Sequence, residues 1–248
     1  MKKGTKYVVL GLVLVLMGTA GYVWSMDKPL DLSLGVPKAE LPTTPDLAVI
    51  GDFVTADYVN IPMAFTSQAP FGEWSDPRQQ DACEEASVAM IRWWQDGRLQ
   101  ISGDEAKADI LALSALSEEM FGTFYDTSAA DTAKLLARWV PEVKYQVVDL
   151  NVEVIEKALH QGKLVIVATD GRLLNNPNFS GGGPERHMFL IKGYDRAKRQ
   201  FIANDVGTRQ GADYLYGYDV VMNALIDYST GNHEPLTSSR KVGLVITK

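Results

Sequence analysis

The chain has 248 residues, of which 46% are hydrophobic and 22% are charged, and its formal net charge is −7. This composition is that of a globular protein long enough for one sizeable core. The acidic balance, without a cluster of lysines and arginines in the domain region, argues against a nucleic-acid partner. Residues 181–184 read Gly-Gly-Gly-Pro and lack the lysine and following helix of a phosphate-binding loop, so they are interpreted as a flexible loop.

The N-terminal segment 1–26 has the pattern of a membrane anchor or a signal peptide. Lys2, Lys3 and Lys6 precede an uncharged apolar run over 7–24, which is close to the minimum length of a membrane span. Small residues inside the run offer a signal-peptidase site, but the run continues beyond them, so an uncleaved anchor is preferred. The positive-inside rule then predicts a single-pass protein of the cell membrane with an extracytoplasmic domain, or a secreted protein if the segment is cleaved.

Residues 27–58 are interpreted as an extended linker. They contain four prolines and few aromatic residues, a composition typical of a tether. The folded domain is expected to occupy 59–248. The sequence predicts no particular oligomeric state.

Cys83 is the only cysteine of the chain, and it lies where a polar stretch runs into an amphipathic helix. Asp81 is expected to cap that helix, with Glu84 completing a capping box, which places Cys83 at the second helical position. Amide groups at a helix N-terminus favour a thiolate, so this position suits a nucleophile whose pKa is depressed. The alternative, a small buried hydrophobic residue, stays open.

The Cys83 helix is expected to bury one face. Ala86, Met90, Trp93 and Trp94 recur at helical spacing on that face, and Gly97 supplies a C-terminal stop. The remaining positions stay polar: Glu84, Glu85, Arg92 and Gln95.

The rest of the domain changes from helical to β along the chain. Three further helical patterns precede a run of β-branched residues, and two later runs form a predicted hairpin. This order predicts an α+β fold with a helical first half and an antiparallel β-sheet in the second half. The predicted helices are 103–121, 127–140 and 152–161, and the predicted strands are 163–169, 187–194 and 200–205.

His187 opens the first strand of the predicted hairpin. If the hairpin turns about Ala197, His187 lies opposite Gly207 and diagonal to Asp205 on the same face, near enough for a carboxylate to reach an imidazole. A slip of one residue would place Asn204 there instead, and asparagine is also a workable orienting group. The other two histidines, at positions 160 and 233, have ordinary interpretations as helix-end and surface residues.

The spacing of these residues argues against the competing kinds of site. The cysteine and the histidines are widely separated, without the short paired spacing of common zinc motifs, so we expect neither a metal nor a cofactor. No Gly-x-Ser-x-Gly turn indicates a serine hydrolase.

Four segments together resemble a known family. Residues 61–74, 81–87 and 187–195, followed by Asn204-Asp205, resemble the papain-like cysteine peptidases of the bacteriocin-processing, double-glycine leader peptidase type, in its stand-alone peptidase-like branch. The resemblance extends from about residue 59 to the end, and its motifs follow the order Cys, His, Asp. It implies a papain-like fold without a cofactor.

The resemblance also implies a role for each matching residue. Cys83 would attack a peptide carbonyl, His187 would carry the proton, and Asp205 would orient the imidazole. A glutamine upstream of the cysteine would stabilise the oxyanion, and Gln68 is the first choice, with Gln79 and Gln80 as competitors because they lie closer to the cysteine.

One position departs from the family pattern. Many relatives have Cys-Gly-Pro where this chain has Cys83-Glu84-Glu85, and two carboxylates beside a thiol oppose its ionisation. The departure fits a modest nucleophile, a basic substrate or a domain without activity. We therefore expect a thiol hydrolase acting on a peptide or protein substrate, with an inactive binding module for peptides or cell-wall polymer, or an acyltransferase or transpeptidase, as the alternatives.

Overall fold

The structure is a computed structural model that describes residues 56–231, 233 and 235–248. The predicted segment 1–26 and nearly all of the predicted linker 27–58 lie outside the described residues. Within the described part of the chain, no helix is long and apolar enough to cross a membrane.

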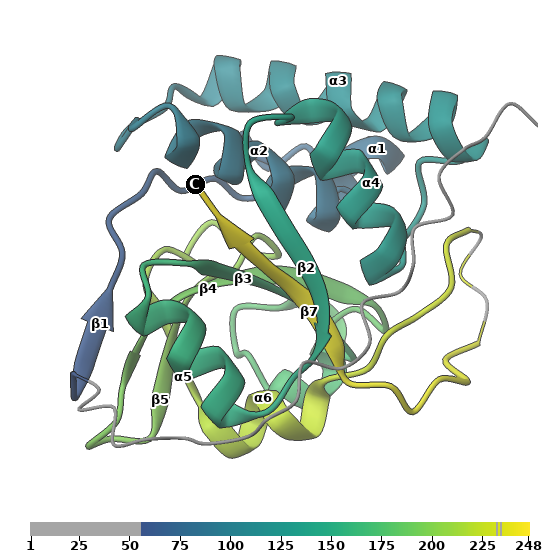
Figure 1. Cartoon of the computed structure of the whole chain (residues 1–248). Helices are drawn as coiled ribbons and strands as arrows, with labels where there is room; N and C mark the ends of the chain where they lie inside the picture. The colour runs from purple at the N-terminus through teal and green to yellow at the C-terminus, as the bar shows by residue number, and fades with distance from the viewer. Residues whose placement is uncertain (1–55, 232, 234) are drawn as a thin grey trace, which may run out of the picture. The chain divides into compact units, whose positions relative to one another are not determined.

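An antiparallel sheet forms the centre of the fold (Figure 1). Its strand order is β2-β7-β3-β4-β5-β6, and β1 pairs with the far part of β4. All the pairings are antiparallel, which confirms the predicted fold class. The strands within the described residues are β1 (Tyr58–Asn60), β2 (Lys144–Asp149), β3 (Leu164–Thr169), β4 (His187–Asp195), β5 (Gln200–Asn204), β6 (Tyr214–Gly217) and β7 (Val242–Thr247).

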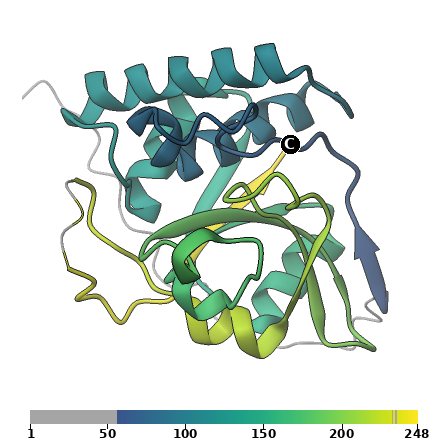
Figure 2. The same cartoon turned by 180° about the vertical axis from the view of Figure 1, so that it is seen from behind.

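Helices cover both faces of the sheet, as Figures 1 and 2 show from opposite sides. The residues of β3 alternate between two cores: Leu164 and Ile166 pack with the helices before β2, whereas Val165 and Val167 pack with the two later helices. A strand that is buried on both faces explains the unbroken apolar run of the sequence. The helices of the first core are α2 (Cys83–Gln95), α3 (Gly103–Phe121) and α4 (Ala129–Trp139), and those of the second are α5 (Val152–His160) and α6 (Tyr218–Ala224). The short helix α1 (Pro77–Gln80) precedes α2.

The three later helices of the prediction are confirmed within two residues. Local chemistry fixes their ends. At α3, the Ser102 side chain accepts a hydrogen bond from Glu105 N, and Gly122 ends the helix in the left-handed conformation with φ 73°. These are signals that a sequence displays directly.

The predicted start of α2 is wrong in its cap. Asp76 caps a separate short helix, α1, whose first residue is Pro77, and Asp81 ends that helix by donating its backbone N–H to Pro77 O. Ala82 therefore occupies the N-cap of α2 without a side-chain hydrogen bond, and Cys83 is the first helical residue. Pro77 starts a separate short helix, and Asp81 follows the last residue of that helix, so Asp81 is a C-cap and not an N-cap.

The predicted polar face of α2 is also wrong at Glu84 and Glu85. Both side chains are buried, each with 1% of its surface exposed, because α2 lies between α3, α4 and β4. The expected apolar positions are buried as predicted, and Gly97 follows the helix with φ 72°. The burial of the two carboxylates bears directly on the neighbouring thiol.

The β4–β5 hairpin has the predicted register near His187 and a different one near its turn. Leu190 pairs with Asn204, as a turn about Ala197 requires, but a bulge between Ile191 and Gly193 shifts the remaining pairs by one residue. At Gly193 an added Cβ would lie only 2.2 Å from Val59 O of the adjoining β1, so this bulged part of β4 needs a glycine.

Candidate active site

Cys83 begins α2 and is enclosed, with only 5% of its surface exposed. Its Sγ accepts a hydrogen bond from the backbone N–H of Met188 at 3.2 Å. The thiol in turn donates to Glu84 Oε2 at 3.0 Å. Since Met188 follows His187 on β4, these contacts hold the sulfur beside the start of that strand.

The surroundings of the thiol keep it protonated. Burial raises the pKa of Cys83 well above its usual value, and the charge of Glu84 raises it further, which outweighs the hydrogen bond from Met188. The pKa is therefore not depressed in this arrangement, in contrast to the expectation from the helix start alone. Glu84 Oε1 accepts hydrogen bonds from Thr127 N at 3.2 Å and from the Tyr228 hydroxyl at 2.8 Å, which fixes the carboxylate in place.

His187 and Asp205 meet as the hairpin register predicts. His187 Nε2 lies 2.8 Å from Asp205 Oδ1, and both side chains are buried. Oδ1 also accepts from Gly207 N at 2.9 Å. The other oxygen, Oδ2, accepts from the Tyr216 hydroxyl and from Asn176 Nδ2.

Burial by itself would raise the pKa of Asp205, but the charge of His187 and the surrounding hydrogen bonds outweigh it, so the pKa is lowered. The aspartate is thus an anion that orients the imidazole through Nε2. Asn204, the alternative that a slip would have brought here, instead donates to Ala64 O at 3.3 Å. The ring nitrogen of His187 that remains for chemistry is Nδ1.

Aromatic rings enclose the imidazole. The Phe189 ring stacks on it with centroids 5.7 Å apart, and the Phe179 ring meets it edge-on at 5.2 Å. Gly207 leaves no room on a third side, because an added Cβ would lie 2.9 Å from His187 Cε1. Among the described residues no hydrogen bond joins the imidazole to Cys83; the thiol contacts the backbone of Met188, the residue after His187 on β4.

Gln68 lies at the helix start, where a predicted oxyanion donor should be. Its side chain is buried, and Nε2 donates to the carbonyl oxygens of Gln79 and Gln80. Gln79 is also buried, with its Nε2 3.4 Å from Glu73 Oε2, whereas Gln80 is exposed. Gln68 therefore braces the two carbonyls that precede the Cys83 helix, and both of its amide hydrogens have acceptors.

A cleft of about 480 Å³ adjoins the buried residues. One wall comes from the segment before α2, and the other comes from the loops after β3 and β5. Phe179 and Gly207 line the cleft and also touch the His187 ring, which connects the cleft to the imidazole. Its lining residues are Gln68, Trp74, Gln80, Asn178, Phe179, Ser180, Gly183, Pro184, Gly207, Thr208, Arg209 and Gln210.

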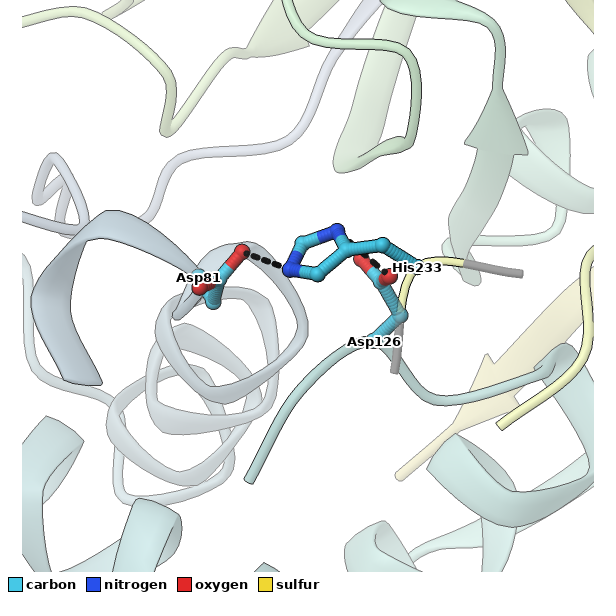
Figure 3. A group of neighbouring side chains, drawn as sticks. All are labelled: Asp81, Asp126 and His233. Carbon is cyan, nitrogen blue, oxygen red and sulfur yellow. Dashed lines mark ion pairs between the residues drawn. The ribbon is translucent and has the colours of Figure 1, made fainter. Parts of the chain in front are cut away.

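A second polar cluster lies on the other side of the cysteine helix start. Asp81, Asp126 and His233 come from three distant segments, and Figure 3 shows the imidazole between the two carboxylates. Burial, with the charge of Glu84, raises the pKa of Asp126 to about 8. The sequence interpretation missed this cluster, because no spacing along the chain links its members.

The Peptidase_C39 like family matches residues 60–231, well over half of the chain. The chain belongs to this family. Membership of this family supports a relationship to the papain-like cysteine peptidases. It does not identify the bacteriocin-processing type. A candidate C39-like peptidase from Bacillus anthracis, known from a crystal structure, is 13% identical, with 78% of this chain and 98% of that one covered at a TM-score of 0.47. No curated protein matches the chain.

Proposed function

We propose that this member of the Peptidase_C39 like family is a thiol hydrolase of peptide or amide bonds, with Cys83 as nucleophile, His187 as general base and acid, and Asp205 as the orienting group. One observation carries the proposal. The His187–Asp205 pair, at 2.8 Å, opens the strand whose next residue, Met188, donates its backbone N–H to the thiol at 3.2 Å. A nucleophile, a base and an orienting group brought near one another in this order support an acyl-transfer reaction.

The reaction begins by releasing the thiol from Glu84. Rotation of the Cys83 side chain towards His187 Nδ1 lets the proton pass from sulfur to the imidazole, and the thiolate attacks the substrate carbonyl carbon. The imidazolium, held by Asp205, then protonates the departing amine as the C–N bond breaks, leaving a thioester. A water molecule gives its proton to His187, its oxygen attacks the thioester carbonyl, and the sulfur leaves and regains the proton.

The cleft sets the substrate class that we propose. Its walls are polar and aromatic, and Arg209 is the one charged residue of its lining. The buried positions of Glu84 and Glu85 remove them as a surface for a basic substrate. We therefore propose a peptide or protein substrate with an acidic group near the cleaved bond. The relationship to the bacteriocin-processing type is a separate proposal, and its support is the order of the Cys, His and Asp motifs.

Thiol reactivity and turnover test the proposal together. A thiol-reactive activity-based probe should label Cys83 of the full-length chain in mild detergent. The same preparation should hydrolyse members of a peptide library. His187→Ala should lower both rates by a factor of roughly 10² to 10⁴, the usual contribution of general acid–base catalysis. His160→Ala, which removes an exposed histidine at the end of α5, is the matched control. Hydrolysis that persists in Cys83→Ser would exclude the thiol mechanism.

A second candidate function, a binding module without catalysis, is favoured by the enclosed, Glu84-bonded thiol. Peptide affinity and product formation distinguish the two functions. A binding module should bind peptide equally well in the wild type and in Cys83→Ser, and it should form no product. The acyltransferase alternative has no observation in its favour, and adding an amine to the reaction and looking for the transfer product tests it.

We also propose that residues 1–26 hold the domain outside the cell membrane. The support is the sequence pattern of three lysines before a span-length apolar run. Fractionation should recover the full-length chain with the membrane and accessible to external protease. Recovery of a soluble chain beginning near residue 21 would show that the segment is cleaved.

A further inference from the structure

Three potential metal ligands from three separate segments meet beside the start of α2. Asp81 ends α1, Asp126 precedes α4, and His233 lies between α6 and β7. One ligand atom from each lies within 4.8 Å of the other two. Figure 3 shows the imidazole between the two carboxylates, with one ion pair to each of them.

Each carboxylate lies close to a different nitrogen of the imidazole. His233 Nε2 lies 3.4 Å from Asp81 Oδ1, and His233 Nδ1 lies 3.2 Å from Asp126 Oδ2. Ligand atoms held at about 2.0–2.1 Å from a zinc ion in tetrahedral geometry are roughly 3.3 Å apart. One ion takes only one of the two ring nitrogens, so the imidazole has to turn for that nitrogen and both carboxylates to bind the same ion.

The burial of Asp126 is an independent observation in favour of a cation site. Its side chain is only 4% exposed, and its Oδ2 accepts no hydrogen bond from the described residues. The nearest buried cation is Arg186, whose Nε is 3.5 Å away, at the limit of a useful contact. A buried carboxylate oxygen aimed into the cluster without a hydrogen bond is stabilised by a metal ion.

The charge around the cluster points the same way. Glu84 and Asp81 lie close enough to act electrostatically on Asp126, so three carboxyl groups are near one buried arginine. A divalent cation would offset this excess of acidic groups. The imidazole ligand favours a transition metal over Mg²⁺ or Ca²⁺, which prefer oxygen ligands alone.

We propose that Asp81, Asp126 and one ring nitrogen of His233 bind a Zn²⁺ ion, with water in the remaining position. The ion ties the segment between α6 and β7 to the segment that leads into the Cys83 helix. The thiol is not a ligand, since Cys83 Sγ is engaged by Glu84 and Met188. The site is thus separate from the proposed triad and does not depend on peptidase activity.

Calorimetric titration of the full-length chain, freed of metal with a chelator and carrying no histidine tag, tests the site. We expect one Zn²⁺ ion per chain. His233→Ala and the isosteric Asp126→Asn should each weaken binding by about 100-fold or more, because even outer partners of metal ligands typically contribute 10- to 100-fold. Two controls should bind as the wild type does: His160→Ala, which removes a histidine elsewhere, and Cys83→Ser, which removes the thiol.

Circular dichroism and the midpoint of thermal unfolding, both measured without metal, show whether each variant is folded. Zn²⁺ should raise the unfolding midpoint of the wild type but not that of folded His233→Ala. Mn²⁺ should bind more weakly than Zn²⁺ at this donor set. Three results would overturn the proposal: no binding to the wild type, binding lost in Cys83→Ser, or binding unchanged in both His233→Ala and Asp126→Asn. The first would identify the cluster as an ion pair between an imidazolium and two carboxylates.

Discussion

Burial and the neighbouring Glu84 together keep the Cys83 thiol protonated. Its carboxylate accepts the S–H hydrogen bond at 3.0 Å, and its charge adds to burial in raising the thiol pKa. The backbone amides at a helix start lower the pKa of a thiol, whereas the charge of the Glu84 side chain raises it. The proton must leave this contact before His187 can take it.

Replacing Glu84 by glutamine should therefore make the thiol more reactive. In Glu84→Gln the amide oxygen can still accept from Thr127 and Tyr228, but the negative charge beside sulfur is gone. We expect iodoacetamide to alkylate Cys83 on the order of tenfold faster at pH 7, since removing a like charge in hydrogen-bond contact lowers a thiol pKa. Glu119→Gln, at an exposed position of α3, is the control. An unchanged alkylation rate would show that burial alone sets the reactivity.

Gln68 braces the segment before the cysteine helix through the carbonyl oxygens of Gln79 and Gln80. We predict that Gln68→Ala lowers the acylation rate about 100-fold or more, the usual loss for an oxyanion donor, whereas Gln80→Ala has little effect because that side chain is exposed. Single-turnover kinetics with both variants folded is the measurement. Since the Gln68 amide hydrogens already have acceptors, a loss confined to substrate affinity would assign it a positioning role instead. A damaging Gln80→Ala or Gln79→Ala would move the oxyanion assignment to the residues just before α2.

At the scale of the element, the first turn of α2 contains a carboxyl group that folding holds neutral. Burial raises the pKa of Glu85 well above its usual value, and the charge of Glu84 adds to the rise. Neither of its oxygens accepts a hydrogen bond from the described residues, although Ser117 is near enough to offset part of the rise. The folded chain therefore keeps a proton that the unfolded chain loses as pH rises above the ordinary value for glutamate.

This difference predicts that stability falls with increasing pH. Between the unfolded pKa near 4.5 and the higher folded pKa, the folded state binds more protons, so the free energy of unfolding decreases as pH rises. Asp126, with its pKa raised to about 8, acts in the same direction. Glu85→Gln should flatten the slope and stabilise the chain at pH 8, because it removes a group that contributes a loss of about 1.4 kcal/mol for each pH unit above its unfolded pKa. Urea unfolding at pH 5 and pH 8 with a chelator present measures this, and an equal slope in both proteins would contradict it.

The loop after β5 depends on a glycine for its fit to the histidine. An added Cβ at Gly207 would lie 2.9 Å from His187 Cε1 and 3.3 Å from Asp205 Oδ1. We predict that Gly207→Ala displaces the imidazole and lowers kcat at least tenfold, since small misplacements of reacting groups reduce rates strongly. Gly217→Ala is the matched control, because its Cβ would meet only Val220 Cγ2 at 3.7 Å. Equal activity of the two variants, with both folded by circular dichroism, would contradict the prediction.

At the scale of the whole described domain, the cleft lies between the segment before α2 and the loops of the sheet. Arg209 lines it and is exposed, and its side chain has no hydrogen bond or ion pair among the described residues. A free guanidinium in a cleft is suited to a carboxylate, which it binds in a bidentate manner. We therefore expect the cleft to favour substrates that carry a carboxylate.

Arg209→Gln should lower kcat/KM for peptides with Asp or Glu near the cleaved bond about 10-fold or more, and should leave neutral peptides nearly unchanged, since a hydrogen bond to a charged group contributes about 1.5–3 kcal/mol. Competition between paired acidic and neutral peptides measures the ratio directly. Arg138→Gln, on α4 and outside the cleft lining, is the control. An equal loss for both peptides would assign Arg209 a structural role.

The sequence by itself determined the parts of this protein that rest on local chemistry. Helical patterns located α3, α4 and α5, and the register of the β4–β5 hairpin placed His187 beside Asp205. It also placed Cys83 at a helix start, although it assigned the cap to Asp81, because one local signal, the proline of α1, competed with another. These features depend on residues that are close in the chain or paired across one turn.

Only the tertiary structure decided which side chains are buried and which distant groups meet. Glu84 and Glu85 look solvated in a helical pattern, but α2 is enclosed by α3, α4 and β4, so both are buried and the charge of Glu84 acts on the thiol at low dielectric. Asp81, Asp126 and His233 share no pattern along the chain and meet through packing alone. The physical reason is the same in both cases: burial and long-range contact depend on how whole elements pack, and periodicity reports only the face of a single element.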